Sequence, residues 1–394
     1  MPMFKYSSRM LRTAIYMLAV TALSSCSWWA GDEAAVMDTV VVPKSIEVAW
    51  STDVDGRKPA DPLAYGQVAL TGKGDTVRLV IGGRDGRAHV YDLSGHESFR
   101  IALSEASDSG AAALSSGLVV LGDTDAQLYA IDTQLGKIAW QFSLSSPLTG
   151  MPVAVDQDIL VQCTDNRIYR MNADGKKVWS FSGQVGGLGL YLNTSPLVHN
   201  GRIYALLTTG DAVALDAKTG DLIWRKQLLL DTDAPDLADL KAPQAIPVWM
   251  PELTLGGNTG KNLVLFSFYQ GEVFALDSND GHALFSHVIS FKSAPLVDGE
   301  RLYAANSHGL FQAIERNTGV IFWQKKLTDA ELVGPVMWHD SLWLADSQGS
   351  VFCLDQAGHM QASIKLPGSI NRAPVVTPKG VLVHTSLGGL YLLH

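Results

Sequence analysis

The sequence is short of charge, of cysteine and of long apolar runs. Charged residues make up only 18% of its 394 residues while hydrophobic residues make up 47%, a balance that excludes an intrinsically disordered chain. Lysine and arginine number 30 against 39 aspartates and glutamates, which gives a formal net charge of -9. Sequence-independent binding to nucleic acid needs a clustered surplus of basic residues, so we expect no nucleic-acid partner. Three cysteines are too few for a disulfide-stapled miniprotein.

Residues 1–25 are typical of a cleavable export signal. A basic start is followed by eleven mainly apolar residues, Thr13–Leu23, which are too few to span a bilayer that needs roughly 20. The next segment, Leu23-Ser24-Ser25-Cys26, is similar to the lipobox of bacterial lipoproteins. We therefore expect cleavage after residue 25, lipidation of Cys26, and a tether over residues 26–45. An ordinary signal peptide in which the cysteine falls by chance is the alternative.

A repeat of about forty residues runs through the rest of the chain. Each unit has alternating apolar residues, then an acidic or amide residue, then an aromatic residue seven or eight positions later. The acidic or amide positions are Asp92, Asp132, Asn172, Asp216, Asp277, Glu315 and Asp355. The aromatic positions, called ring residues below, are Phe99, Trp140, Trp179, Trp224, Phe285 and Trp323, with Ala362 near that place in the seventh unit.

The alternation and the unit length together predict the fold. An apolar period of two indicates short antiparallel strands, and four such strands account for about forty residues, the length of a β-propeller blade. The positions six residues before each acidic or amide residue and before the chain end are Gly86, Ala126, Asn166, Gly210, Gly271, Gly309, Gly349 and Gly388. Six of these eight are Gly and one is Asn, the residue types that suit a tight turn. Eight units predict an all-β, eight-bladed propeller of four-stranded antiparallel blades over residues 46–394. Two unrelated β-sandwiches would not produce one continuous register.

The two chain ends complete each other. The eighth unit stops at His394, just after its third strand, and so lacks the strand that would carry a ring residue. Residues Ile46–Val54 look like a fourth strand without its first three, and Trp50 occupies the ring position. Pairing these ends would close the ring and remove two exposed sheet edges. We expect the ring residues to pack between neighbouring blades rather than to form a ligand cage.

Catalytic and metal-binding patterns are missing from the sequence. Cys163 and Cys353 fall in the third and seventh units, on opposite sides of an eight-membered ring, so we expect two buried thiols and no disulfide. His96-Glu97 lacks the second histidine of a zinc motif, because position 100 is Arg. Gly256–Asn262 has one residue too few for a phosphate-binding loop. We therefore expect no enzyme activity, no cofactor and no metal.

The irregularities of the repeat are insertions. The interval from Asp216 to Asp277 is 61 residues instead of about forty, and its surplus includes Leu228–Asp239 and the stretch from Leu253 to Asn262. A smaller insertion before the fourth unit contains Gly186–Leu192, in which leucines and a tyrosine alternate with glycine. The smaller insertion is either a strand extension with buried leucines or an exposed apolar patch on which another protein docks.

The lipobox, the acidic tether, Ala49-Trp50-Ser51-Thr52 and the eight repeats together resemble the BamB family of outer-membrane β-barrel assembly lipoproteins. That family falls within the larger group of propellers whose repeats are like those of pyrroloquinoline-quinone enzymes. The resemblance implies a non-catalytic scaffold on the periplasmic face of the outer membrane. Such a scaffold binds the barrel insertase BamA, works with the other subunits of the BAM complex, and assists the folding and insertion of unfolded outer-membrane proteins.

The resemblance also implies contact residues for BamA. In the family, the insertase-contacting loop before the fourth blade carries a Leu-x-Leu-Arg pattern, and Leu188, Leu190 and Tyr191 stand in the corresponding place here. Tyr191 departs from the family arginine. The family also uses acidic residues in the loop that leads into the fifth blade, where this chain has Asp236 and Asp239. The alternatives are an envelope lipoprotein that binds another protein or a carbohydrate, and a quinone-dependent dehydrogenase.

Overall fold

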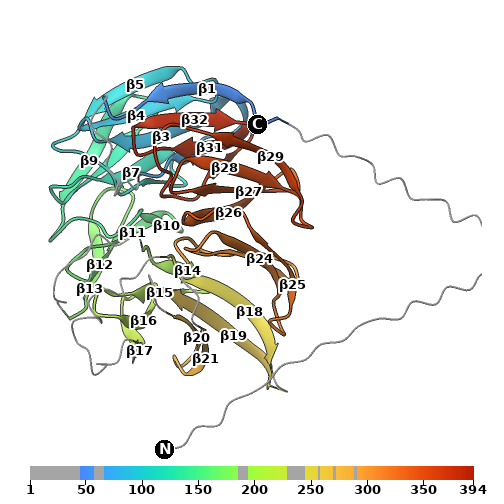
Figure 1. The fold of residues 1–394 in the computed structure, drawn as a ribbon. Coiled ribbons are helices and arrows are strands. Elements are labelled where there is room, and N and C mark those ends of the chain that lie inside the picture. Colours follow the sequence, from blue (N-terminus) through green and yellow to red (C-terminus); the bar gives the residue numbers. More distant parts are fainter. Residues whose placement is uncertain are drawn as a thin grey trace, which may run out of the picture. The chain divides into compact units, whose positions relative to one another are not determined.

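The computed structural model describes residues 45–56, 66–184, 194–228, 245–255, 258–268, 272–287 and 291–394. These residues form eight antiparallel sheets of four strands each, which follow one another in chain order, as the colours of Figure 1 show. The one helix among the described residues is the short 3₁₀ helix η1 (Gly74–Thr76). The predicted eight-bladed propeller of four-stranded blades is confirmed.

Each blade is numbered in chain order and its strands are given from the inner to the outer position. Blade 1 consists of β2 (Ala69–Thr71), β3 (Arg78–Gly83), β4 (Arg87–Asp92) and β5 (Glu97–Ala102), and blade 2 consists of β6 (Ala111–Ala113), β7 (Leu118–Gly122), β8 (Gln127–Asp132) and β9 (Lys137–Ser143). Blade 3 consists of β10 (Val153–Val155), β11 (Asp158–Gln162), β12 (Arg167–Met171) and β13 (Lys177–Ser182), and blade 4 consists of β14 (Leu197–His199), β15 (Arg202–Leu206), β16 (Asp211–Asp216) and β17 (Leu222–Gln227). Blade 5 consists of β18 (Val248–Leu255), β19 (Asn258–Ser267), β20 (Val273–Asp277) and β21 (Ala283–His287), and blade 6 consists of β22 (Leu296–Asp298), β23 (Arg301–Ala305), β24 (Leu310–Glu315) and β25 (Ile321–Lys326). Blade 7 consists of β26 (Leu332–Trp338), β27 (Ser341–Asp346), β28 (Ser350–Leu354) and β29 (Met360–Lys365), and blade 8 consists of β30 (Val375–Thr377), β31 (Gly380–His384), β32 (Gly389–Leu393) and β1 (Val48–Asp53).

The core lies between blades rather than at one centre. Strands of blade 1 and blade 2 bury Val80, Val90, Leu121 and Tyr129 in one shared apolar cluster. Because alternate residues of a strand point to opposite faces of its sheet, each middle strand packs against both neighbouring blades and is apolar on both faces. The alternation seen in the sequence therefore divides residues between two interfaces, not between core and solvent.

The first and last strands of the described chain close the ring. Strand β1 pairs antiparallel with β32, with Trp50 opposite Leu392, and Figure 1 shows the blue β1 beside the red β32. Beyond the strands, the backbone N–H and carbonyl of Glu47 bond reciprocally to those of His394, at 3.0 and 3.1 Å. The closure predicted for Ile46–Val54 is confirmed.

A β-bulge interrupts the outer strand of each blade, always at the residue before the ring position. In blade 6, Trp323 pairs with Ala313 and Ile321 pairs with Ile314, which leaves Phe322 as the extra residue. The other extra residues are Ala49, Ser98, Ala139, Val178, Ile223, Leu284 and Gln361. A bulge re-aims the side chains around it and twists the strand, so the bulge positions the ring residue over the next blade.

The surplus of the fifth unit is partly an extended hairpin. Its inner strands β18 and β19 are 8 and 10 residues long, whereas the corresponding strands β22 and β23 of blade 6 have 3 and 5. Figure 1 shows this hairpin reaching beyond the neighbouring strands of the ring. Of the predicted surplus from Leu253 to Asn262, residues 253–255 and 258–262 therefore belong to strands of the fold, and residues 256–257 lie outside the described ranges.

Candidate functional site

The repeated acidic or amide side chains organise turns. Oδ1 of Asp216 accepts hydrogen bonds from the backbone N–H groups of Lys218 at 2.8 Å and Thr219 at 2.9 Å. The bond from the Thr219 backbone N–H is the largest of the effects that lower the pKa of this carboxyl below its ordinary value. Equivalent bonds are made by Asp92, Asp132, Asn172, Asp277, Glu315 and Asp355. These side chains are therefore engaged in the fold and do not form a set of free carboxylates.

The ring residues join each blade to the next. The indole Nε1 of Trp224 in blade 4 donates to the carbonyl of Ser278 in blade 5, and a Cβ on Gly281 would lie 2.7 Å from the Trp224 ring. Glycine at the end of the turn thus makes room for the indole. The same arrangement recurs as Trp50 on Gly95, Trp140 on Gly175, Trp179 on Gly220 and Trp323 on Gly358, and Phe99 packs on Gly136 without the hydrogen bond. The packing role predicted for the ring residues is confirmed for these six, and the side chain of Phe285 lies outside the described part of the structure.

Blade 7 reaches blade 8 differently. Its residue near the ring position, Ala362, lies in a buried cluster with Trp343 of the second strand and with Val381 and Val383 of blade 8. Trp338 packs edge-on against Trp343, with ring centroids 5.9 Å apart. Two indoles from the inner strands of the same blade, Trp338 and Trp343, therefore fill the interface that an indole of the outer strand fills in other blades.

A buried ion pair lies where blade 1 meets blade 8. Asp55, which follows β1 and is 1% exposed, accepts bonds from the backbone N–H of Arg84 at 2.9 Å and from its Nε at 2.8 Å. Nη2 of Arg84 donates to the carbonyl of Ser386 in the loop between β31 and β32. This pair links blade 1 to both chain ends, and we call Asp55, Arg84, Ser386 and His384 the closure seam.

His384 of the closure seam is held as a neutral ring. Its Nδ1 lies 3.2 Å from the carbonyl of Gly66, so this nitrogen carries the proton, while Nε2 has no hydrogen-bond partner among the described residues and lies 4.0 Å from Asp55 Oδ2. Burial lowers the pKa of His384 below its ordinary value, and it outweighs the opposing attraction of Asp55.

No arrangement for catalysis or metal binding is found among the described residues. They contain no cluster of three or more His, Cys, Asp or Glu side chains suited to a metal ion. Cys163 and Cys353 are both buried, as predicted, and no disulfide joins them, and burial raises the pKa of the Cys163 thiol to about 12. A thiol with that pKa is a poor nucleophile. The buried Lys292 ammonium is engaged by Glu331 at 2.7 Å and by Asn371 at 3.3 Å.

The predicted site residues lie outside the described ranges. Leu188, Leu190 and Tyr191 fall in residues 185–193, Asp236 and Asp239 fall in residues 229–244, and Cys26 falls in residues 1–44. The described part of the chain also contains no helix with the length and apolarity needed to cross a bilayer.

The residues that directly follow residues 185–193 and 229–244 are described, and they are hydrogen-bonded to each other. Oγ1 of Thr194, at the end of the first segment, donates to the carbonyl of Ala245, at the end of the second, at 3.1 Å. Both residues are buried. The segments run from an outer strand to the next inner strand, from blade 3 to 4 and from blade 4 to 5, so both connect the blades at the same end of the ring.

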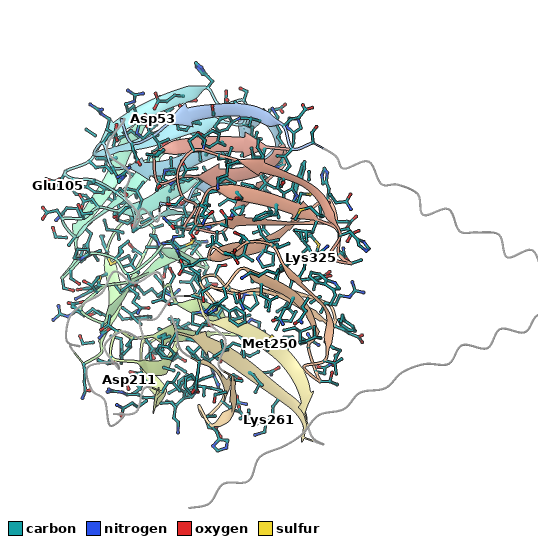
Figure 2. The ribbon with its side chains drawn as sticks, viewed as in Figure 1. Asp53, Glu105, Asp211, Met250, Lys261 and Lys325 are labelled. Atoms are coloured by element: carbon teal, nitrogen blue, oxygen red, sulfur yellow. The ribbon has the colours of Figure 1, made fainter. Side chains whose placement is uncertain are left out.

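The starting side of the first segment is held by a second set of contacts. Asn166 is fully buried at φ 65°, and its Nδ2 donates to the carbonyl of Gln184 at 2.8 Å. Oε1 of Gln184 accepts from Nη2 of Arg225 at 2.9 Å, and the same nitrogen also bonds Oδ2 of Asp211, which Figure 2 labels on blade 4. Sequence reasoning missed Arg225 and Thr194. The asparagine in place of the usual glycine at position 166 was the one available signal.

The comparisons with known proteins place the chain in a family. A family model described as "Outer membrane protein assembly factor BamB" matches residues 84–325 and 249–361, which together cover more than half of the chain. The chain belongs to the BamB family. Curated BamB relatives match over nearly the whole length: the Yersinia pestis protein is 25% identical over 95% of this chain and 96% of its own, and the Bordetella pertussis protein is 24% identical over 98% and 97%.

Solved structures support the fold. The crystal structure of BamB from Moraxella catarrhalis matches with a TM-score of 0.73 at 17% identity, covering 89% of this chain and 99% of that chain. A quinohemoprotein alcohol dehydrogenase from Pseudomonas putida HK5 matches with a TM-score of 0.66 at 13% identity, covering 88% of this chain and 76% of that chain. At these identities the likeness extends to the propeller alone, because one fold serves many functions.

Proposed function

We propose that this chain is a non-catalytic scaffold of outer-membrane protein assembly. It is anchored through a lipidated Cys26 to the periplasmic face of the outer membrane, binds BamA within the BAM complex, and assists the folding and insertion of unfolded outer-membrane proteins. Family membership supports the assembly role, since the curated relatives that match nearly full length are named outer membrane protein assembly factors.

The observation that carries the proposal is the contact between the two residues that follow residues 185–193 and 229–244. The side-chain hydroxyl of Thr194 donates to the carbonyl of Ala245, and both residues are buried. A binding surface made of two segments gains affinity when their bases are preorganised, because less conformational freedom is lost on association. We propose Leu188, Leu190 and Tyr191 on the first segment, and Asp236 and Asp239 on the second, as the BamA contact.

The engaged state of the repeated polar side chains supports a scaffold over an enzyme. Asp216 and its equivalents bond turn backbone, and the ring residues bond the next blade. The gain from such a protein would be the orientation and local concentration of its partners, which requires no bond-making.

Capture of BamA from cross-linked cells tests the proposal. We expect the triple variant Leu188→Ala, Leu190→Ala, Tyr191→Ala to lose BamA while its urea unfolding curve stays that of the parent. Leu135→Ala is the matched control, because Leu135 is an exposed apolar residue, 63% accessible, in a turn of blade 2. Unchanged capture by the triple variant would remove these residues from the contact.

The same capture separates the remaining possibilities. Another envelope protein or a carbohydrate on the cross-linked chain, with no BamA, would point to a different partner. If the purified protein showed a quinone absorbance band and turned over an alcohol, it would be an enzyme and the scaffold proposal would be wrong. Cys26→Ser should release the chain from the membrane fraction; a variant that still sediments with membranes would contradict the lipid anchor.

A further inference from the structure

The outer strand of blade 6 begins with exposed apolar side chains. Val320, Ile321 and Phe322 are 59%, 47% and 51% exposed, a run of three neighbouring large apolar residues facing solvent. Phe322 is the extra residue of the β-bulge, which turns it away from the ladder of β24. The guanidinium carbon of Arg301 lies 5.6 Å from the centre of its ring. Exposed apolar groups of this size, grouped together, mark interaction surfaces.

The same strand ends with two lysines and carries no acidic residue. Lys325 donates to the carbonyl of Gly358 at 2.8 Å, which uses one of its three N–H groups. Lys326 donates to the carbonyl of His308 and lies 3.2 Å from Asp329, whose side chain is 96% exposed. An ion pair this exposed contributes little and can exchange partners. Figure 2 labels Lys325 on this outer strand. In a chain of net charge -9, this segment combines apolar and basic groups.

The strand also offers unpaired backbone. Strand β25 is the last strand of its sheet, and among the described residues it is hydrogen-bonded to β24 alone. From Trp323 to Lys326 its pairing with β24 is regular. Such an edge needs hydrogen-bond partners, which an added peptide strand supplies and lipid acyl chains do not. We call Arg301 and residues 320–326 the blade 6 edge.

We infer that the blade 6 edge binds an extended polypeptide segment that is apolar in one half and acidic in the other. The apolar half packs against Ile321 and Phe322, the acidic half pairs with Lys325 and Lys326, and the backbone between them adds to β25. Arg301, which lies over the Phe322 ring, is a third cation of this edge and pairs with an acidic side chain next to the apolar half.

Comparison with the other outer strands selects blade 6. Strand β17 has the same order, with Leu222 and Ile223 exposed at its start and Arg225 and Lys226 near its end. Arg225, however, is engaged by the buried carboxylate of Asp211 and by Gln184. At the bulge position, blades 1, 2, 7 and 8 have only Ser98, Ala139, Gln361 and Ala49. Blade 3 exposes Val178 at its bulge, but its outer strand β13 ends in Ser-Phe-Ser. The outer strand β21 of blade 5 contains no lysine or arginine.

The identity of this segment in the cell rests on the proposed function, because unfolded outer-membrane proteins are extended chains. The docking edge itself does not require BamA. An assay with purified protein and synthetic peptide can therefore fail while capture of BamA succeeds, and the reverse can also occur.

Fluorescence anisotropy with a labelled synthetic peptide tests the inference. The peptide carries valine and phenylalanine in one half and two glutamates in the other, and its reversed sequence covers both strand directions. We expect Phe322→Ser, which installs the residue that blade 1 has at this position, to weaken binding about tenfold, or about 1.4 kcal/mol. The double variant Lys325→Glu, Lys326→Glu should abolish binding of this peptide and gain binding of one with lysines in place of the glutamates. Ile223→Ser on β17 is the matched control and should leave the affinity unchanged.

Backbone pairing is tested separately with a peptide N-methylated at alternate residues along either edge. Methylation on the pairing edge should abolish binding, and methylation on the other edge should have little effect. Equal binding of all methylated peptides would exclude strand addition. An equal loss in Ile223→Ser and Phe322→Ser would remove the assignment to blade 6. Binding to phosphatidylglycerol vesicles through Phe322, with no peptide binding, would overturn the inference in favour of a lipid surface.

Discussion

The indole of Trp224 donates a hydrogen bond of 3.0 Å to the carbonyl of Ser278, 54 positions further along the chain and in the next blade. This bond and the packing of the ring on Gly281 connect two sheets that share no backbone ladder. Side chains of this kind, repeated around the ring, couple blades whose edges are otherwise independent. Their removal therefore tests how cooperative the propeller is.

Substitution at Trp224 should separate the hydrogen bond from the packing. Trp224→Phe keeps a ring, as Phe99 does naturally in blade 1, and should cost about 1 kcal/mol of unfolding free energy. Trp224→Ala also leaves a cavity at a residue only 7% exposed and should cost about 3–5 kcal/mol. Urea unfolding measures both. Equal losses in the two variants would show that the ring contributes nothing beyond the bond.

Truncation at the start of the chain should reveal the contribution of ring closure. A variant that begins at Ser45 keeps β1, so its thermal midpoint should match that of the full chain. A variant that begins at Asp55 lacks β1, which exposes the edge of β32 and removes Trp50 from Gly95. We expect a clearly lower midpoint in calorimetry for this second variant. Identical midpoints would contradict closure as a source of stability.

The closure seam should be sensitive to acid. Because the pKa of His384 is lowered in the folded chain from its ordinary 6.5, the unfolded chain binds more protons just below that pH. The stability from the neutral ring is therefore complete above pH 6.5 and is lost as the pH falls below it, by at most about 1.4 kcal/mol per unit. The charged groups facing the ring are Asp53, Asp55 and Arg84.

Unfolding curves of the parent and of His384→Gln at several pH values would measure this effect. Subtracting one pH dependence from the other removes the contribution of carboxylates shared by both chains. A difference of zero across pH 5 to 7 would show that His384 is protonated equally in both states.

One substitution in blade 7 should stabilise the protein. In blade 2, Oδ2 of the buried Asp123 accepts the hydroxyl of Tyr129 at 2.9 Å. The equivalent Asp346 of blade 7 has Phe352 in the tyrosine position, and its Oδ2 has no hydrogen-bond partner among the described residues. Phe352→Tyr should therefore add about 1 kcal/mol in urea unfolding. Tyr129→Phe is the mirror control and should lose stability; a gain there would contradict the explanation.

The repeat made most of the fold predictable. An acidic or amide residue recurs at the position of Asp216 because the turn between two strands needs a hydrogen-bond acceptor for its backbone N–H groups. A glycine recurs at the position of Gly281 because an indole packs against it. Both requirements come from local geometry repeated in each blade, so the spacing alone identified the strands, the number of blades and the closure by Trp50.

The remaining features depend on contacts that break the repeat. The bulge at Phe322 has no signature, because its residue type varies from serine to phenylalanine among the blades. The Arg225 contact with Gln184 joins different blades across 41 positions, and nothing in either local sequence indicates it. The apolar start of β25 looks in the sequence like any half-buried strand, and its exposure follows from its place at the sheet edge.

The pairing of Glu47 with His394 leaves the two described ends of the propeller side by side in one blade. A short glycine-rich linker could join these two ends, and new termini could then be introduced in an exposed turn, such as that of Asn279 and Asp280. Circular permutants of this kind should fold to the same ring. They would also let the proposed lipid attachment point be moved from blade to blade, and so test which orientation of the propeller the proposed function requires.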